Sequence, residues 1–199
     1  MASPDPEDTF VSRGGLKLDA ALDHFAVDVE GLTCADLGAS VGGFTDCLLQ
    51  RGAARVYAVD TSYGPFAWKL RQDDRVTLLE RTNVLHMNPA DQLEGFAGCD
   101  LVVIDLGWTP QARALPAARN WLADDGQVVT LIKPQYEPEG NEAGGGVLDD
   151  DIAERVVEAA TDRIREMGWD VRGVMPSPVR GGGRRGSGPG NREALAWLA

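Results

Sequence analysis

The most informative part of the sequence is TCADLGASVGGFTDCLLQ, residues 33–50. A short apolar run, Thr33 to Leu37, precedes a turn with glycines at positions 38, 42 and 43, and a helical segment from Gly43 to Gln50 follows. Glycines permit a tight turn and let a ligand approach the backbone, and the free N–H groups of a helix N-terminus can bind it. A glycine turn can also be purely structural, so the surrounding sequence has to decide between the two.

Strand-like and helix-like segments alternate around this turn. The early strand-like runs are continuously apolar, which indicates strands covered on both faces. We therefore expect an α/β, Rossmann-like fold with a seven-stranded, mostly parallel sheet, helices on both faces, and a ligand at the carboxyl ends of the strands. The predicted strands are Thr33–Leu37, Arg55–Asp60, Val76–Glu80, Leu101–Leu106, Gln127–Ile132, Asp170–Met175 and Glu193–Leu198.

Two further helices are predicted. An opening helix has Ser12 as its N-cap, and an apolar face recurs at the spacing typical of a helix. The clearest helix runs from Asp150 to Met167, with acidic residues at its start and Gly168 after its end. Two stretches, Glu137–Gly146 and Gly181–Gly190, read as irregular loops, either functional or simply mobile.

Length and composition indicate one globular domain. The chain has 199 residues, and we expect a disordered or extended tail over residues 1–10 and a single domain over 11–199. It contains no apolar run long enough to span a membrane, so a cytoplasmic location is expected. The three cysteines and two histidines are too scattered for a disulfide framework or a metal knuckle, and no metal is expected.

The charge distribution is uneven. The net charge of −12 opposes non-specific binding to nucleic acid over the whole surface. Residues 171–192 contain no Asp or Glu and carry five arginines: Arg172, Arg180, Arg184, Arg185 and Arg192. This basic segment is either a local site for a polyanion or a solvated glycine-rich loop.

Acidic residues beside the glycine turn suggest a nucleoside ligand. Asp60 ends the second predicted strand, where its carboxylate can accept both hydroxyl protons of an adenosine ribose. Asp36 precedes the first glycine, and the spacing from Gly38 to Gly42 makes a wider turn than that of dinucleotide-binding enzymes. Such a turn suits a nucleoside that bears an amino acid. Asn83 follows the third strand, where it could bind the adenine edge or simply form a turn.

The three lysines stand out against 16 arginines. Lysine can lose its proton in a suitable environment, whereas arginine cannot, so only lysine can serve as a proton acceptor. Lys133 directly follows the apolar run Val128–Ile132, and Asp105 follows the run Leu101–Ile104, each on the side where an α/β active site belongs. Lys17 lies beside the apolar face of the first helix, and Glu193 opens the last strand. Taken singly, Lys17 could be a solvated helix residue, Asp105 a helix cap and Glu193 a surface strand residue.

Six segments together resemble the FtsJ-like rRNA methyltransferases, and within them the TlyA or hemolysin-A branch. The resemblance covers the chain from Val11 onward, and six motifs in order are far more specific than one glycine turn. The segments are SRGGLKL (12–18), DLGASVGGFTDCLLQ (36–50), VYAVD (56–60), ERTN (80–83), IKPQY (132–136) and GNRE (190–193).

The resemblance implies a Rossmann-like methyltransferase domain over 11–199 that uses S-adenosylmethionine to methylate a ribose 2′-hydroxyl of RNA, with ribosomal RNA expected. It implies a catalytic set of Lys17, Asp105, Lys133 and Glu193, in which Lys133 is the base and the others orient the ribose. The cofactor-binding residues by the same resemblance are Asp36, Gly38, Ala39, Ser40, Gly42, Gly43, Phe44, Asp60, Asn83 and Asp105.

Three departures from the family pattern bear on RNA binding. Relatives carry a small N-terminal RNA-binding domain, whereas this sequence reaches Ser12 almost at once, so we expect RNA to be held by the arginine-rich segment or by a partner. Gly107-Trp108 stands where the family has Ser-Phe, and the stretch 142–147 lacks the usual lysine. The candidate RNA-binding residues are Arg13, Trp108, Arg180, Arg184 and Arg185.

Two other functions stay open. The acidic net charge is also compatible with a methyltransferase that acts on a small molecule or a protein. A cofactor-binding regulatory protein without turnover would share the fold. Trp108 could stack on a target base or lie at the edge of the core.

Overall fold

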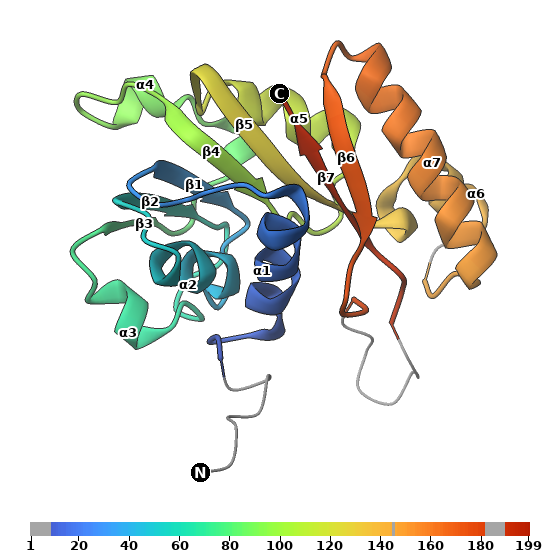
Figure 1. The fold of residues 1–199 in the computed structure, drawn as a ribbon, viewed down its shortest axis with the longest axis horizontal. Helices are drawn as coiled ribbons and strands as arrows, with labels where there is room; N and C mark the ends of the chain where they lie inside the picture. The colour runs from blue at the N-terminus through green and yellow to red at the C-terminus, as the bar shows by residue number, and fades with distance from the viewer. Residues whose placement is uncertain (1–8, 145, 182–189) are drawn as a thin grey trace.

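The computed structural model describes residues 9–144, 146–181 and 190–199. Their strands form one sheet in the order β3-β2-β1-β4-β5-β7-β6 (Figure 1). β1 to β5 pair in parallel, and β7 runs antiparallel between β5 and β6, so the predicted seven-stranded, mostly parallel sheet is confirmed. The strands are β1 Thr33–Leu37, β2 Arg55–Val59, β3 Val76–Leu79, β4 Cys99–Ile104, β5 Leu122–Ile132, β6 Val171–Pro176 and β7 Ala194–Leu198.

Helices cover both faces of the sheet. Side chains alternate along each strand, so Val56 and Leu101 pack with α1 and α2 on one face, whereas Tyr57 and Val102 pack with α5 and α7 on the other. The described helices are α1 Arg13–Phe25, α2 Gly43–Gln50, α3 Trp68–Arg71, α4 Pro89–Gln92, α5 Gln111–Arg119, α6 Pro138–Glu142 and α7 Asp150–Glu166, with short 3-10 turns η2 Val84–His86 and η3 Pro134–Tyr136.

The start of the domain is fixed by local contacts. Ser12 is the N-cap of α1, as predicted, and its hydroxyl accepts a hydrogen bond from the Gly14 N–H at 3.3 Å. Phe10 is buried against Gly15, where any side chain would collide with the phenylalanine ring. Residues 1–8 of the predicted tail lie outside the described residues.

One expected loop is partly helical. The interpretation of 137–146 as irregular is wrong for Pro138–Glu142, which form α6. This helix packs on the neighbouring η3 turn, where Gly140 lies so close to the Pro134 carbonyl that a Cβ atom would overlap it. This packing of α6 on η3 involves backbone atoms and leaves no periodic signal in the sequence. Most of the other expected loop, residues 182–189, lies outside the described residues.

Three strands end one or two residues earlier than predicted, and this matters for the site. β2 ends at Val59, β3 at Leu79 and β4 at Ile104, so acidic residues follow each strand directly instead of lying within it. Asp60 and Asp105 still bond through their backbone N–H groups to Leu79 and Leu37 of the neighbouring strands. The two carboxylates are therefore held at the carboxyl edge of the sheet.

Candidate functional site

Two adjoining cavities lie at the carboxyl ends of the parallel strands. The larger, of about 560 Å³, is bounded by loops that follow β2, β3, β4 and β5. The smaller, of about 240 Å³, lies between the glycine turn and the start of α1. Gly38, Ser40 and Asp105 line both cavities, so the two form one continuous site with Asp105 at the boundary.

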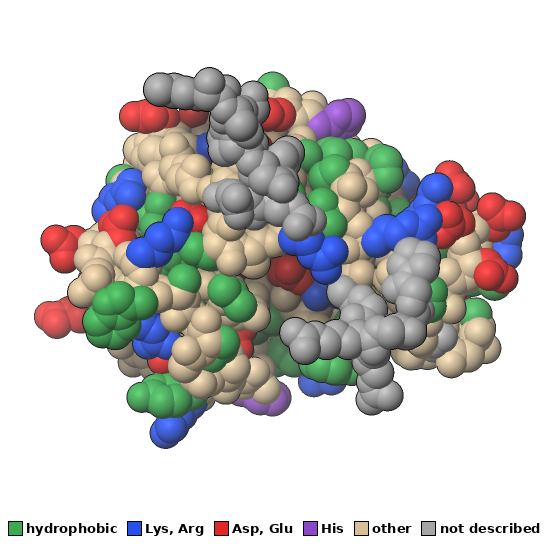
Figure 2. Space-filling view, turned by 90° about the horizontal axis from the view of Figure 1, so that it is seen from below, with side chains coloured by type: hydrophobic (Ala, Val, Ile, Leu, Met, Phe, Trp, Pro, Cys, Tyr) green, Lys and Arg blue, Asp and Glu red, His purple; other side chains and the backbone are tan. Residues whose placement is uncertain are grey.

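Figure 2 looks at the molecule from the side of these strand ends. Near the centre of the view, Lys and Arg side chains surround a recessed acidic group. Most of the other Asp and Glu side chains visible in the view lie toward its edges. The acidic protein thus has basic side chains grouped around the mouth of the site.

The glycine turn is held between three segments of the chain. Gly38 has a φ of +100° and lies against the Asp105 backbone carbonyl, leaving no space for a side chain. At the start of α2, a Cβ on Gly43 would collide with the Ser12 hydroxyl. The Ser40 N–H donates to Asp60 Oδ2 at 2.8 Å. The turn is consequently fixed against the loop after β4, the start of α1 and the end of β2.

Asp36 lines neither cavity and instead supports the glycine turn from the buried interior of the protein. It is completely buried, and its Oδ2 accepts hydrogen bonds from the Thr45 N–H at 2.9 Å and the Thr45 hydroxyl at 2.6 Å. Its Oδ1 has no hydrogen-bond partner among the described residues. Burial raises the pKa of Asp36 to about 7, although the bonds from Thr45 oppose the shift. Asp36 therefore links β1 to α2.

Asp60 lines the larger cavity and is oriented by three donors. Besides Ser40, the Ser62 N–H and hydroxyl donate to its Oδ1 at 2.7 and 2.6 Å. A carboxylate offers about four lone-pair sites, so it can accept a further hydrogen bond from a ligand. Ser62 was missed by the sequence analysis, although the Asp60-Thr-Ser62 spacing is typical of a turn in which an aspartate bonds two residues on.

Asn83 forms the turn that was one of its two predicted roles, and its binding to adenine stays a prediction. Its side-chain oxygen accepts from the Leu85 N–H at 3.0 Å and so begins η2, which confirms the turn. The residue also lines the larger cavity. The bond from Leu85 uses one of the two lone pairs of this oxygen, and the side-chain nitrogen can also donate to a ligand.

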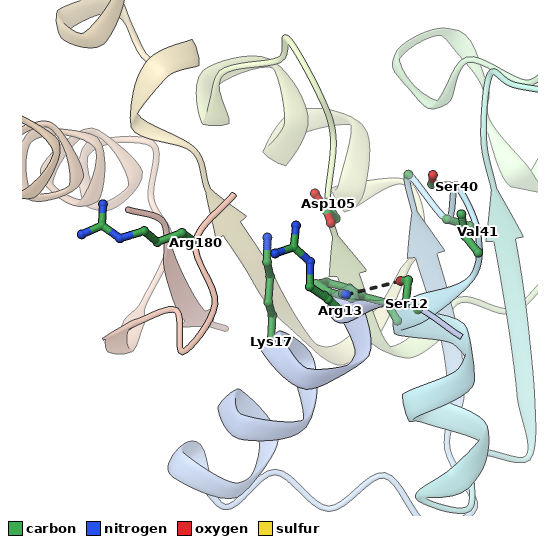
Figure 3. Close-up of a pocket in the computed structure, with 12 residues that line it drawn as sticks. Ser12, Arg13, Lys17, Ser40, Val41, Asp105 and Arg180 are labelled. Atoms are coloured by element: carbon green, nitrogen blue, oxygen red, sulfur yellow. Dashed lines mark hydrogen bonds between the residues drawn. The ribbon is translucent and has the colours of Figure 1, made fainter. Parts of the chain in front are cut away.

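The four residues of the implied catalytic set occur as two ion pairs. Lys133 pairs with Asp105 Oδ1, and Lys17 pairs with Glu193 Oε2. Lys17 and Asp105 line the smaller cavity, and Asp105 and Lys133 line the larger one. Figure 3 shows Lys17 and Arg13 reaching from α1 toward Asp105. The structure thus brings all four to one site. Glu193 lines neither cavity and joins the site through its ion pair with Lys17.

The alternative interpretations of these residues are wrong. Lys17 and Glu193 are 7% and 5% exposed, so neither is a solvated surface residue. Glu193 precedes β7 and lies against Gly181, at which a Cβ would collide with its carboxylate. Asp105 does not cap a helix, because α5 begins at Gln111 with Pro110 as its N-cap.

Of the predicted cofactor-binding residues, most line the two cavities and two do not. Asp36 and Gly42 lie behind the cavity wall; Gly42 has a φ of +101° and packs against Phe66 and Leu70. The residues that line the cavities are Gly38, Ala39, Ser40, Gly43, Phe44, Asp60, Asn83 and Asp105.

The predicted RNA-binding arginines separate into three groups. Arg13 is exposed at the rim of the smaller cavity. Arg180 also lines the smaller cavity, but its guanidinium donates to the Asp150 carboxylate at 2.9 and 2.7 Å and in Figure 3 extends away from Lys17 and Arg13. Arg184 and Arg185 lie outside the described residues.

Trp108 is 84% exposed, so its interpretation as a residue at the edge of the core is wrong. It has a φ of +52°, and its ring lies 5.8 Å from that of Tyr136, measured between centroids. Trp108 and Lys133 both line the larger cavity, and Tyr136 ends the η3 turn that Lys133 begins. Tyr136 was missed as a site residue because nothing in the sequence pairs it with Trp108.

The described residues show neither a metal-binding group nor a membrane-spanning helix. Among the described residues, no group of three or more His, Cys, Asp or Glu side chains is arranged to hold a metal ion. Cys34, Cys47 and Cys99 are buried and free. Within residues 9–144, 146–181 and 190–199, none of the helices has the length and apolar character needed to cross a bilayer.

Comparison with known proteins gives consistent matches. A model of the FtsJ-like methyltransferase family matches residues 10–186. The chain is 45% identical to the 16S/23S rRNA (cytidine-2′-O)-methyltransferase TlyA of Mycobacterium tuberculosis, over 98% of this chain and 70% of that protein. It is 36% identical to Hemolysin A of Brachyspira hyodysenteriae, over 94% and 75%. The solved structure titled "Putative hemolysin from Streptococcus thermophilus" superposes with a TM-score of 0.85 at 42% identity, covering 98% of this chain and 68% of that one.

Proposed function

The chain belongs to the FtsJ-like methyltransferase family, and we propose that it transfers a methyl group from S-adenosylmethionine to a ribose 2′-hydroxyl of RNA. Ribosomal RNA is the proposed substrate class, since the similar mycobacterial protein is named for 2′-O-methylation of cytidine in 16S and 23S rRNA. The observation that carries the proposal is the arrangement of Lys133–Asp105 and Lys17–Glu193 around the boundary of the two cavities.

The larger cavity fits the proposed cofactor in size and chemistry. Its volume of about 560 Å³ lies within the range of roughly 300–1,000 Å³ typical of small-molecule sites. Asp60 and Asn83 provide an acceptor and a donor for the adenosine, and the glycine turn leaves room for the amino-acid part. The residues proposed to hold the cofactor are Gly38, Ala39, Ser40, Gly43, Phe44, Asp60, Asn83 and Asp105, with Asp36 and Gly42 supporting them from behind.

The ion pairs suit transfer to a hydroxyl group. When bound, S-adenosylmethionine supplies an electrophilic methyl group on a positively charged sulfur. Lys133 Nζ, as a neutral amine, is the proposed acceptor of the 2′-hydroxyl proton while the ribose oxygen takes the methyl group; the ammonium that results pairs with Asp105, which fixes its position. Lys17, held by Glu193, lies across the smaller cavity, where its ammonium can donate to a ribose oxygen. Orienting the reactants in this way converts binding energy into rate.

Contacts to RNA are proposed at the rim. Arg13 is exposed beside the smaller cavity and can bind a phosphate, and Trp108 exposes a large aromatic face that can stack on a base. Since the net charge of −12 repels RNA elsewhere on the surface, such local contacts have to provide the binding.

The proposal is tested with radiolabelled S-adenosylmethionine and RNA from cells that lack this protein. We expect the wild type to incorporate label that resists alkaline hydrolysis as a 2′-O-methylated dinucleotide. Lys133→Ala should abolish incorporation. Lys133→Arg should abolish it too, because arginine keeps the positive charge beside Asp105 but cannot accept a proton. Lys69→Ala, which changes an exposed lysine on α3, is the matched control.

The outcomes separate the three candidate functions. Robust incorporation by Lys133→Arg would refute the proton-acceptor role. Label that appears in protein or small molecules would favour another methyltransferase substrate. Cofactor binding by calorimetry without any transfer would indicate a regulatory protein. RNA binding should weaken steeply between about 50 and 200 mM salt, whereas a neutral substrate would show little change.

A further inference from the structure

A buried carboxylate outside the implied catalytic set connects the two loops of the site. Glu137 is 1% exposed. Its Oε1 accepts a hydrogen bond from the Gln111 N–H at 2.9 Å, and its Oε2 pairs with Arg163 at 3.0 Å. Neither cavity is lined by Glu137, so its role has to be sought in what it holds together.

The first element that Glu137 holds is the start of α5. Gln111 is the first residue of this helix, and its N-cap is Pro110, which provides no side-chain cap. The Glu137 carboxylate therefore caps a helix that begins 26 residues earlier in the chain. The loop that ends at this cap begins at Asp105 and carries Trp108. Glu137 thus fixes the far end of the Asp105 loop.

The second element is the segment that carries Lys133. This lysine is the N-cap of η3, and Glu137 follows η3 directly. Two bonds are made to residues before Lys133 by the Gln111 side chain. Its Nε2 donates to the Leu131 carbonyl at 3.1 Å, and its Oε1 accepts from the Thr130 hydroxyl at 2.8 Å. The start of α5 is accordingly bonded to the chain both before and after Lys133.

Arg163 of α7 offsets the cost of burying the charged Glu137 carboxylate. Burial raises the pKa of Glu137, whereas the Gln111 N–H and Arg163 oppose the shift; the other carboxylate nearby is Glu139, which also pairs with Arg163. An ionised carboxylate inside a protein requires such a partner. The contact between Glu137 and Gln111 depends on this neighbour from a third element.

We propose that Glu137 is a positioning residue that sets the distance between Asp105 and Lys133 by joining α5 to the end of η3. The inference rests on the proposed methyl transfer for its effect on rate. A displacement of about 1 Å at a reacting group can lower a rate by about 100-fold. Loss of the contact should therefore lower kcat and leave the KM for RNA and the Kd for the cofactor nearly unchanged.

Two double variants isolate the contact. In Glu137→Met/Arg163→Met, an apolar pair of similar size replaces the ion pair, which proteins commonly tolerate, but the cap on α5 is lost. In Glu137→Gln/Arg163→Met, the charges are also absent, yet the glutamine oxygen can still accept from Gln111. We expect kcat to fall about 10- to 100-fold in the methionine variant and to be largely rescued in the glutamine variant.

Amide hydrogen exchange provides a readout that does not depend on methyl transfer. The segments 105–113 and 133–137 should exchange faster in the methionine variant than in the glutamine variant, while the exchange of β1 and β2 is the same in both. Equal exchange and equal kcat in the two variants would overturn the inference. If the wild type transfers no methyl group to RNA, the proposed function fails, and exchange alone still decides whether Glu137 holds the two loops.

Discussion

Lys17 and Glu193 form a buried ion pair although 176 residues separate them in the chain. The lysine comes from the first helix, and the glutamate comes from the residue before the last strand. Each charge would be costly in this position without the other. The pair thus belongs both to the proposed chemistry and to the stability of the fold.

Removing one partner should be worse than removing both. Glu193→Ala leaves the Lys17 ammonium buried and unpaired, and we expect it to lower the free energy of unfolding by about 3–5 kcal/mol. Lys17→Met/Glu193→Leu should lie much closer to the wild type. Denaturant unfolding of the two variants checks this, and a double variant that is less stable than Glu193→Ala would contradict it.

Asp36 should make stability depend on pH. Its pKa is raised to about 7 in the folded state, so between about pH 4 and pH 7 the folded protein binds a proton that the unfolded chain has released. Stability therefore falls as pH rises through this range and levels off above it. Asp36→Asn has no carboxyl to ionise. We expect the wild type to lose a few kcal/mol relative to this variant between pH 5 and 8, measured by urea unfolding; a difference independent of pH would refute the assignment.

Gly38 should be irreplaceable because of a contact as well as its backbone conformation. Gly38 and Gly64 have φ values of +100° and +96°, but a Cβ at 38 would collide with the Asp105 carbonyl, whereas nothing lies within 4 Å at 64. Gly64→Ala should cost about 1–2 kcal/mol from the strained backbone alone. Gly38→Ala should cost more and abolish cofactor binding in calorimetry. Equal effects at the two positions would show that the collision does not matter.

Asp60 should control cofactor affinity. Asp60→Ala removes a carboxylate that is oriented by Ser40 and Ser62, and hydrogen bonds to a charged group are worth about 1.5–3 kcal/mol. The Kd for S-adenosylmethionine should rise about 10- to 100-fold. Asp74→Ala, at an exposed position, is the control. An unchanged Kd in Asp60→Ala would place the adenosine elsewhere.

Trp108 should contribute to RNA binding and not to cofactor binding. Loss of base stacking in Trp108→Ala should cost about 1–3 kcal/mol of RNA affinity. Trp108→Phe should recover most of it. Trp68, which is 71% exposed on α3, provides a matched control as Trp68→Ala. Equal RNA affinities for the two alanine variants, measured at one salt concentration, would argue against stacking.

The sheet was predictable because its strands are continuous apolar runs. Thr33–Leu37 and Gly43–Gln50 were predicted with their observed bounds, since apolar residues and glycines mark both ends. The predicted strand bounds were wrong where polar residues lie at the strand ends. β5 begins at Leu122 and includes Asp124 and Asp125, whereas the predicted strand begins at Gln127.

The candidate site was predictable where residues follow strands and was not where contacts are tertiary. Asp105 and Lys133 could be paired in advance because the carboxyl ends of parallel strands meet at one edge. The helix α5 escaped prediction, since Pro116 interrupts its pattern and its N-terminal cap comes from Glu137. Nothing local in QARALPAAR or PQYEPEG indicates that those two segments meet.

The position of β7 between β5 and β6 has a consequence for the biogenesis of the enzyme. During synthesis on the ribosome, Lys17 is made early, whereas the carboxylate of Glu193, its ion-pair partner, is made only after the first six strands. The final strand must then insert between two that precede it, a step of high contact order that is expected to come late in folding. A nascent or prematurely released polypeptide could acquire much of its architecture and still be inert toward RNA.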